Sequence, residues 1–271
     1  MKSKIPISGI LAVSIAALSL LATACSTCCH KSTAAPNTLT AQEKADGWQL
    51  LWDGKTTDNW RSPKSDEFPV KSWSIANGVL TVDPGMTNGE AEAQSGGDII
   101  TRERYANFEF AADFKTTPGC NSGIKIFVQP NLSPIDKATG KPTGVGSAIG
   151  MEFQILDDER HPDAKLGRNG DRKLGSFYDV LPAPTTKKVA PMGEWNHARI
   201  LSQGKHVEFW LNGEKILEFE RGSAAFREAV ALSKFKDIPD FGEWADGHIL
   251  LQEHGSEVSF RNVKIRVLAA N

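Results

Sequence analysis

From residue 48 onward, the chain consists of short segments in which apolar and polar residues alternate, separated by turns rich in Gly, Pro, Asn and Asp. A period of two residues is that of a β-strand with one buried face. Two turns, Asn77-Gly78 and Asn212-Gly213, carry the dipeptide preferred in tight β-hairpins. Strands are expected at residues 49–52, 73–76, 79–82, 98–101, 108–115, 123–129, 150–156, 196–202, 206–211, 214–220, 248–254 and 258–267. With one short helix expected at 224–232, the pattern predicts an all-β fold, a sandwich or jelly roll in a single domain.

The start of the chain has the features of a secretory signal peptide over residues 1–24, with a basic beginning, an apolar run and small residues before Cys25. The apolar run has about 12 residues, whereas about 20 are needed to span a bilayer. Residues 21–25 resemble a bacterial lipobox, so Cys25 is the expected lipidation site. Residues 25–45 are expected to be a tether and residues 46–268 the folded domain. We therefore expect an exported lipoprotein that faces the periplasm or the cell surface and contacts the membrane only through its lipid.

Charge and cysteine content narrow the possible ligands. The net charge is −2, and both signs are interspersed along the chain. No basic surface for a nucleic acid is predicted, and a neutral ligand such as a sugar fits better. Cys120 is the only cysteine in the expected domain, so a disulfide scaffold is not expected.

The expected strand at 150–156 carries the most informative polar residues. Its apolar residues share one face, and Glu152 and Gln154 share the other. A carboxylate beside an amide suits the floor of a sugar-binding cleft. The spacing Glu152-x-Gln154-x-x-Asp157 also matches the E-x-D-x-x-E strand of laminarinase-like retaining glycosidases, in which a bulge returns the last acid to the face of the first two. The alternative is an ordinary solvent-facing strand.

The same alternation places Lys125 on the polar face of strand 123–129, and Gln252 and His254 on that of strand 248–254. If these strands neighbour strand 150–156, one sheet face gathers a carboxylate, a histidine, a cation and two amides. Amides and charged groups orient sugar hydroxyls, and a carboxylate or histidine can transfer protons.

Four long stretches poor in core-forming residues separate these strands, at 84–97, 129–147, 157–176 and 233–247. Loops of this length are usually functional or disordered. The last two are rich in charged and aromatic residues, so we expect them to wall a cleft, with Tyr178 and Trp244 beside the sugar. The acids between Asp157 and Asp163 could hold Ca²⁺, although an exposed charged loop is the simpler interpretation. No cofactor is expected to be required, and the metal content stays open.

Seven motifs, in order along residues 46–268, resemble those of a known family. They lie at residues 48–54, 121–124, 152–157, 193–196, 210–213, 233–236 and 251–262. Together they are similar to the 3-keto-disaccharide hydrolase domain family. The resemblance implies a concanavalin A-like jelly-roll β-sandwich, and a substrate that is a disaccharide or other glycoside oxidised to a ketone at carbon 3.

The implied chemistry is simple, because a ketone at carbon 3 acidifies the proton on carbon 2. A base removes that proton, the enolate expels the group at carbon 1, and water adds back. On this reading Glu152 or His254 is the base and the other assists the leaving group, while Lys125 stabilises the enolate oxygen. The remaining expected substrate contacts are Gln154, Asp157, Tyr178, Gln252, Arg261, Lys234 and Trp244.

Three other functions fit the same sequence. A non-catalytic lectin would keep the aromatic and amide residues without a protonatable pair. A conventional retaining glucanase would need the carboxyls of Glu152 and Asp157 about 5–5.5 Å apart. A tethered structural protein of the envelope would need none of these groups.

Overall fold

Two antiparallel sheets form the part of the chain that the computed structural model describes, residues 35–83, 97–132 and 147–270. The expected signal peptide, Cys25 and the rest of the expected tether up to residue 34 lie outside these residues, as do most of the stretches 84–97 and 129–147. The large sheet contains, in order, β11 (Glu214–Glu220), β10 (His206–Leu211), β9 (Trp195–Gln203), β6 (Phe108–Thr116), β13 (Val258–Val267), β4 (Val79–Val82) and β3 (Trp73–Ala76), with β1 (Trp48–Leu50) paired to β13. The small sheet contains β2 (Trp60–Arg61), β5 (Ile99–Thr101), β12 (His248–Leu251), β7 (Asn121–Gln129) and β8 (Ile149–Leu156).

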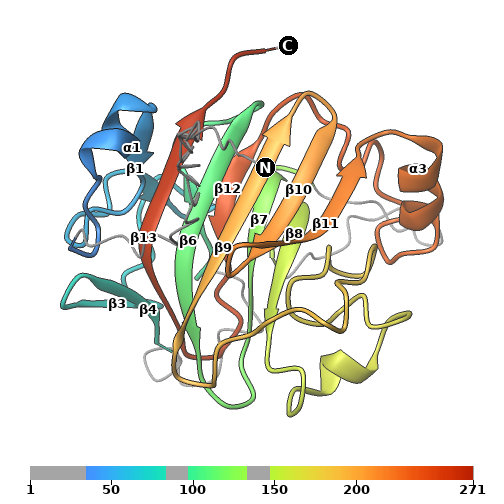
Figure 1. Ribbon diagram of the computed structural model, residues 1–271, viewed down its shortest axis with the longest axis horizontal. Coiled ribbons are helices and arrows are strands. Elements are labelled where there is room, and N and C mark those ends of the chain that lie inside the picture. Colours follow the sequence, from blue (N-terminus) through green and yellow to red (C-terminus); the bar gives the residue numbers. More distant parts are fainter. Residues whose placement is uncertain (1–34, 84–96, 133–146, 271) are drawn as a thin grey trace, which may run out of the picture. The chain divides into compact units, whose positions relative to one another are not determined.

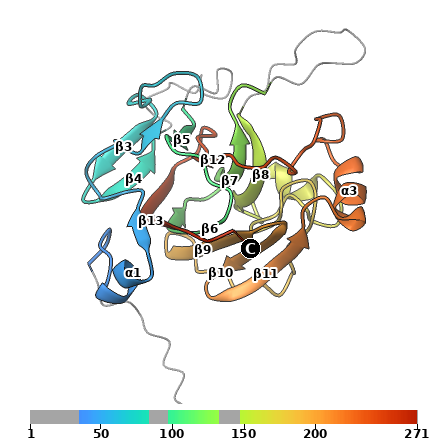
Figure 2. The ribbon, with the colours of Figure 1, turned by 90° about the horizontal axis from the view of Figure 1, so that it is seen from above.

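The sheets lie face to face (Figures 1 and 2). Aromatic side chains form much of the core between them. Phe114 of the large sheet meets Phe153 of the small sheet at a ring-centroid distance of 6.4 Å, and Phe153 meets Phe209 at 5.4 Å. All three side chains are fully buried. Such tilted and edge-to-face contacts are favourable for aromatic rings. The predicted all-β jelly-roll sandwich is therefore confirmed.

The described helices are short: α1 (Ala41–Ala45), the 3₁₀ helix η2 (Pro162–Lys165) and α3 (Ala224–Ala231). The composition predicts α3, and Ser223 caps its first turn by accepting a hydrogen bond from the Phe226 N–H. In the described part of the chain, no helix combines the length and hydropathy needed to cross a membrane.

The segment before β1 corrects the expected extent of the tether. Thr40 and Glu43 form a reciprocal capping box at the start of α1. Asn37 is buried, exchanges hydrogen bonds with the backbone N–H and side chain of Asn262, and donates to the Gly78 carbonyl at 2.7 Å. Residues 37–45 therefore belong to the fold. Composition misses this because a few polar contacts, rather than apolar burial, hold the segment.

A β-bulge changes the expected faces of β7. Regular alternation predicts Val128 in the core and Phe127 on the opposite face. In the structure Phe127 has φ 55°, and the β7–β8 register shifts between Ile126 and Gln129. Phe127 consequently enters the main core, and Val128 packs with a separate small cluster. Gly247 makes this close approach possible, because a β-carbon there would collide with the Phe127 backbone.

Candidate active site

The outer face of the small sheet gathers most of the predicted site residues. Lys125 of β7 pairs in register with Glu152 of β8, and Gly123 pairs with Gln154. Because the pairing is regular here, Lys125, Glu152 and Gln154 all point away from the core. Gln252 follows β12, and its backbone N–H donates to the Gly123 carbonyl at 2.9 Å. These four side chains share one face, as the alternation predicts.

Glu152 is buried in a polar environment. Its carboxylate lies 3.7 Å from the Lys125 ammonium. The amide orientation that satisfies both ends of Gln154 places its nitrogen 3.0 Å from Glu152 Oε1 and 3.0 Å from the Ser122 carbonyl. Gly123 on the neighbouring strand leaves space for the carboxylate, since a β-carbon at that position would collide with Oε1. The Glu152 carboxylate is therefore fixed in direction and partly neutralised by a cation.

Lys125 is held by a second layer of polar groups. Its ammonium donates to Ser147 Oγ at 2.6 Å and to the Ala148 carbonyl at 3.2 Å. Ser147 in turn donates to Asp98, which also accepts from the Glu253 N–H at 3.0 Å. Burial raises the pKa of Asp98 to about 6, although the charge of Lys125 acts in the opposite direction.

A segment that pairs with the outer edge of β8 places Tyr178 beside Glu152. β8 is the last strand of its sheet, and residues 175–178 bond to its free edge. The Tyr178 N–H donates to the Glu152 carbonyl at 3.0 Å, and the Gly175 N–H donates to the Gln154 carbonyl at 2.8 Å. The intervening Phe177 stacks on Phe219 in the core at 5.1 Å. Backbone pairing and an aromatic anchor together fix this wall of the site.

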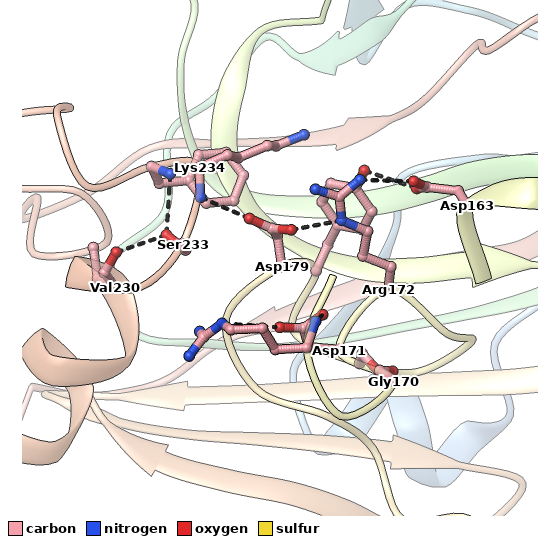
Figure 3. Close-up of polar contacts among 12 residues, drawn as sticks. Asp163, Gly170, Asp171, Arg172, Asp179, Val230, Ser233 and Lys234 are labelled. Atoms are coloured by element: carbon pink, nitrogen blue, oxygen red, sulfur yellow. Dashed lines mark hydrogen bonds and ion pairs between the residues drawn. The ribbon is translucent and has the colours of Figure 1, made fainter. Parts of the chain in front are cut away.

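A chain of polar contacts then joins this wall to the loop after α3 (Figure 3). The Tyr178 hydroxyl donates to Asp163 at 2.8 Å, and Arg172 bonds to both Asp163 at 2.8 Å and Asp179 at 2.5 Å. Asp179 also accepts from the Lys234 backbone N–H at 2.6 Å. Burial and the hydrogen bond to Asp163 raise the pKa of Tyr178, so its hydroxyl stays protonated at neutral pH.

The Lys234 ammonium contacts two aromatic rings but has no hydrogen-bonding or ionic partner among the described residues. The group lies 4.2 Å from the Tyr178 ring centroid and 5.1 Å from that of Phe235. It makes no hydrogen bond or ion pair with any residue in the described ranges. Although much of the side chain is exposed, surrounding protein atoms desolvate the ammonium and lower the pKa of Lys234. Lys125 lowers it further, and Glu152 opposes the shift.

Strand alternation does not place three of the predicted substrate contacts, Arg261, Trp244 and His254, on the outer face of the small sheet. Arg261 belongs to β13 of the large sheet, pairs with Asp113 at 3.3 Å and covers the Trp195 ring at 4.1 Å. Trp244 packs edge-on against Phe241 at 5.8 Å. β12 ends at Leu251, so strand alternation does not set the direction of the half-buried His254.

Asp157 follows β8, and its carboxylate stabilises the adjoining loops through hydrogen bonds. β8 pairs regularly with β7 from Glu152 to Leu156, without the bulge that would return Asp157 to the face of Glu152. Its carboxylate accepts from the backbone N–H groups of Gly119 and Glu159 at 2.7 and 3.1 Å, and from the Arg160 side chain at 3.2 Å. Burial acts to raise the pKa of Asp157, but these hydrogen bonds outweigh it and lower the pKa. Glu152 and Asp157 are therefore not brought onto one face as the carboxylate pair of a retaining glucanase.

The acids proposed for Ca²⁺ are each bonded to protein donors. Asp158 accepts from the Leu174 N–H at 2.7 Å and from Lys187 at 3.0 Å, and Asp163 bonds to Arg172 and Tyr178. Within the described ranges, only His206, Glu208 and Glu218 bring three possible ligand atoms within reach of one another. Lys215 already forms ion pairs with both of these glutamates.

A jelly roll with a carboxylate, a lysine and amides on one sheet face is the class of fold and site found in carbohydrate-active proteins. Residues 47–266 match the family described as the 3-keto-alpha-glucoside-1,2-lyase-like domain, and the chain belongs to this family. A 3-keto-disaccharide hydrolase of Bacteroides thetaiotaomicron is 34% identical over 234 residues, which are 83% of this chain and 79% of that protein. The family resemblance of the sequence motifs is confirmed.

Two solved structures share the fold. Both are candidate glycosyl hydrolases from Parabacteroides distasonis. One is 32% identical with a TM-score of 0.70 and covers 87% of this chain and 100% of that chain. The other is 30% identical with a TM-score of 0.56 and covers 82% of this chain and 99% of that chain.

Proposed function

We propose that this protein hydrolyses 3-keto-glycosides, such as 3-keto-disaccharides, at the outer face of its small sheet. The observation that carries the proposal is the fixed Glu152 carboxylate, 3.7 Å from Lys125 and 3.0 Å from the Gln154 amide, in a chain of this family. The Bacteroides relative, a 3-keto-disaccharide hydrolase, supports the substrate class. One buried, oriented carboxylate is sufficient for a substrate whose carbon 2 proton is already acidified by a ketone.

The proposed reaction is an elimination followed by hydration. Glu152 removes the proton on carbon 2, the electron pair is delocalised toward carbon 3, and the group at carbon 1 departs. Water then adds at carbon 1. The family description names a 1,2-lyase, a class of enzyme that eliminates a group, which agrees with the first step. The separation of Asp157 from the face of Glu152 also favours this route over direct displacement.

Other residues are assigned by their free hydrogen-bonding capacity. Lys125 is engaged with Ser147, Ala148 and Glu152, so it positions the base. This engagement makes it a poor partner for the enolate oxygen, the role that the sequence suggests. Gln252 Oε1 is buried and lacks a partner among the described residues, as expected for an acceptor of a substrate hydroxyl. His254, near Gln252 in the chain, is assigned to the leaving group.

The test is a comparison of oxidised and unoxidised sugars. The purified protein is incubated with 3-keto-trehalose, 3-keto-lactose and both parent disaccharides, and the released sugar is measured. We expect release only from the keto substrates. Equal rates on the parents would indicate an ordinary glycosidase, and binding of the keto sugars without cleavage would indicate a lectin.

Solvent deuterium separates elimination from displacement. In D₂O, removal of the carbon 2 proton should place deuterium at carbon 2 of the released keto-sugar above the level in an enzyme-free control. Cleavage with deuterium only at the control level would contradict elimination. Loss of this deuterium in Glu152→Gln but not in His254→Ala would identify Glu152 as the base.

Export and attachment of the protein through a lipid on Cys25 complete the proposal. Their support is the signal-peptide pattern of residues 1–24 and the lipobox-like residues 21–25. Labelling with a palmitate analogue should be lost in Cys25→Ala. Unchanged labelling would move the lipid to Cys28 or Cys29.

A further inference from the structure

We propose that Lys234 forms a Schiff base with the carbon 3 ketone, so that the electron sink of the reaction is an iminium ion rather than an enolate. This inference rests on the proposed function, because it requires a keto-sugar as substrate. A lysine amine reacts with a carbonyl carbon when it is near the substrate, uncommitted to another partner and partly deprotonated.

The first two conditions come from contacts. The Lys234 backbone N–H is bound to Asp179, and Arg172 fixes Asp179 in turn. The ammonium lies over the Tyr178 ring at 4.2 Å, and the Tyr178 backbone is bonded to Glu152. Since the Lys234 ammonium has no acceptor among the described residues, it can approach a substrate without breaking a hydrogen bond. Lys125, by contrast, would have to give up its bonds to Ser147 and Ala148.

The electrostatic environment supplies the third condition. Desolvation and the nearby cations Lys125 and Arg172 favour the neutral amine of Lys234, while Glu152 and Asp179 favour the ammonium. The net effect lowers its pKa. A desolvated lysine beside other cations is the usual setting of an amine that attacks carbonyl groups. The Tyr178 hydroxyl does not compete, because it donates to Asp163.

The proposed steps balance in atoms and charge. The neutral Lys234 amine adds to carbon 3, and the resulting carbinolamine takes up one proton from solvent and loses one water to form the C=N⁺ bond; this proton is returned when the iminium is hydrolysed. Glu152 takes the carbon 2 proton, and the electron pair forms an enamine. The enamine expels the oxygen at carbon 1, which leaves as an alcohol after protonation. Water then adds at carbon 1 while carbon 2 regains a proton, and a second water hydrolyses the iminium, so each cleavage consumes one water overall.

Reductive trapping tests the covalent step. The full-length protein is incubated with a 3-keto-disaccharide and cyanoborohydride, which reduces an iminium faster than a ketone at neutral pH. Peptide mass mapping should locate a sugar adduct on Lys234, and the parent disaccharide should give none. In Lys234→Arg, which keeps the charge and the backbone contact, the adduct should fall to background. Lys236→Arg, which changes a nearby exposed lysine, should retain the wild-type level.

A second measurement needs no variant. Reversible iminium formation replaces the ketone oxygen with solvent oxygen, so turnover in H₂¹⁸O should label carbon 3 of the product faster than spontaneous hydration does. Wild-type cleavage of the keto substrate with neither adduct nor excess ¹⁸O would overturn the Schiff base and leave the proposed function intact. An adduct that persists in Lys234→Arg would also overturn it. If the wild type cleaves no keto substrate, both proposals fail.

Discussion

At the scale of single residues, turnover should depend most on the Glu152 carboxylate. Glu152→Gln keeps the size of the side chain and removes its basicity. We expect kcat to fall by about 10²–10⁴-fold, the usual contribution of a general base. The melting temperature should change little, because Lys125 keeps its bonds to Ser147 and Ala148. Glu159→Gln is a matched control on an exposed glutamate of the following loop. Near-normal turnover in Glu152→Gln would place the base elsewhere.

Asp98 predicts a pH dependence of stability. Burial raises its pKa from the ordinary 3.8 to about 6 in the folded protein. Because the folded state then binds the proton more tightly than the unfolded state, the associated stability is present below about pH 4 and is lost as pH rises through about 6. Asp98→Asn does not titrate. From pH 4 to pH 7, the free energy of unfolding of Asp98→Asn should therefore rise by up to about 3 kcal/mol relative to that of the wild type. Denaturant titrations at both pH values measure this gain, and parallel profiles would contradict it.

At the scale of elements, the wall at residues 175–179 depends on Arg172. This side chain is one-fifth exposed and bonds to two largely buried carboxylates, Asp163 and Asp179. Arg172→Ala leaves both carboxylates unpaired, so we expect a loss of about 2–4 kcal/mol in unfolding free energy. Because Tyr178 and Lys234 would no longer be held in position, kcat/KM should also fall. Arg168→Ala removes an exposed arginine of the same loop as the control. Equal effects of the two substitutions would show that the contact chain does not order the wall.

Strand alternation predicts a site residue correctly only where pairing is regular. β8 alternates without interruption, so the direction of Glu152 and Gln154 follows from the sequence. In β7 the bulge at Phe127 reverses the faces, and bulky residues at positive φ have no reliable sequence signal. β12 ends at Leu251, and Gln252 makes the last backbone bond to β7, so the alternation does not extend to His254. Alternation therefore gives the floor of the site and fails at its margins.

The walls of the site could not be derived in the same way. Lys234 lies over the Tyr178 ring, and its backbone N–H is bound to Asp179, but the two segments that meet here are far apart in the chain and no local pattern relates them. The sequence does identify loops 157–176 and 233–247 as rich in charged and aromatic residues. It does not show which side chain of each loop turns toward Glu152. Arg261 illustrates the opposite error, since its motif is shared by the family but its side chain covers Trp195 on the other sheet.

At the scale of the whole molecule, the sandwich is predictable because many short amphipathic strands leave few other ways to bury apolar surface. The segment before β1 is the exception. It joins parts of the chain that are distant in sequence: Asn37 binds Asn262 and Gly78, and Glu43 pairs with Lys264. Polar contacts of this kind have no hydrophobic period, so composition assigns the segment to a linker.

The last prediction concerns this segment. A chain beginning at Asp46 should be less stable than one beginning at Ala35. Three hydrogen bonds of the buried Asn37, at 2.6, 2.8 and 2.7 Å, are lost, and their partners on Asn262 and Gly78 lose them. With about 0.5–1.5 kcal/mol per hydrogen bond, the free energy of unfolding should fall by about 2–4 kcal/mol. Denaturant titration measures the difference. In the full-length protein, Asn37→Ala should reproduce most of the loss, because it removes two of the three bonds, whereas Gln42→Ala, on the exposed side of α1, should have little effect. Equal stability of the two shortened chains would return residues 35–45 to the tether and leave the sandwich independent of them.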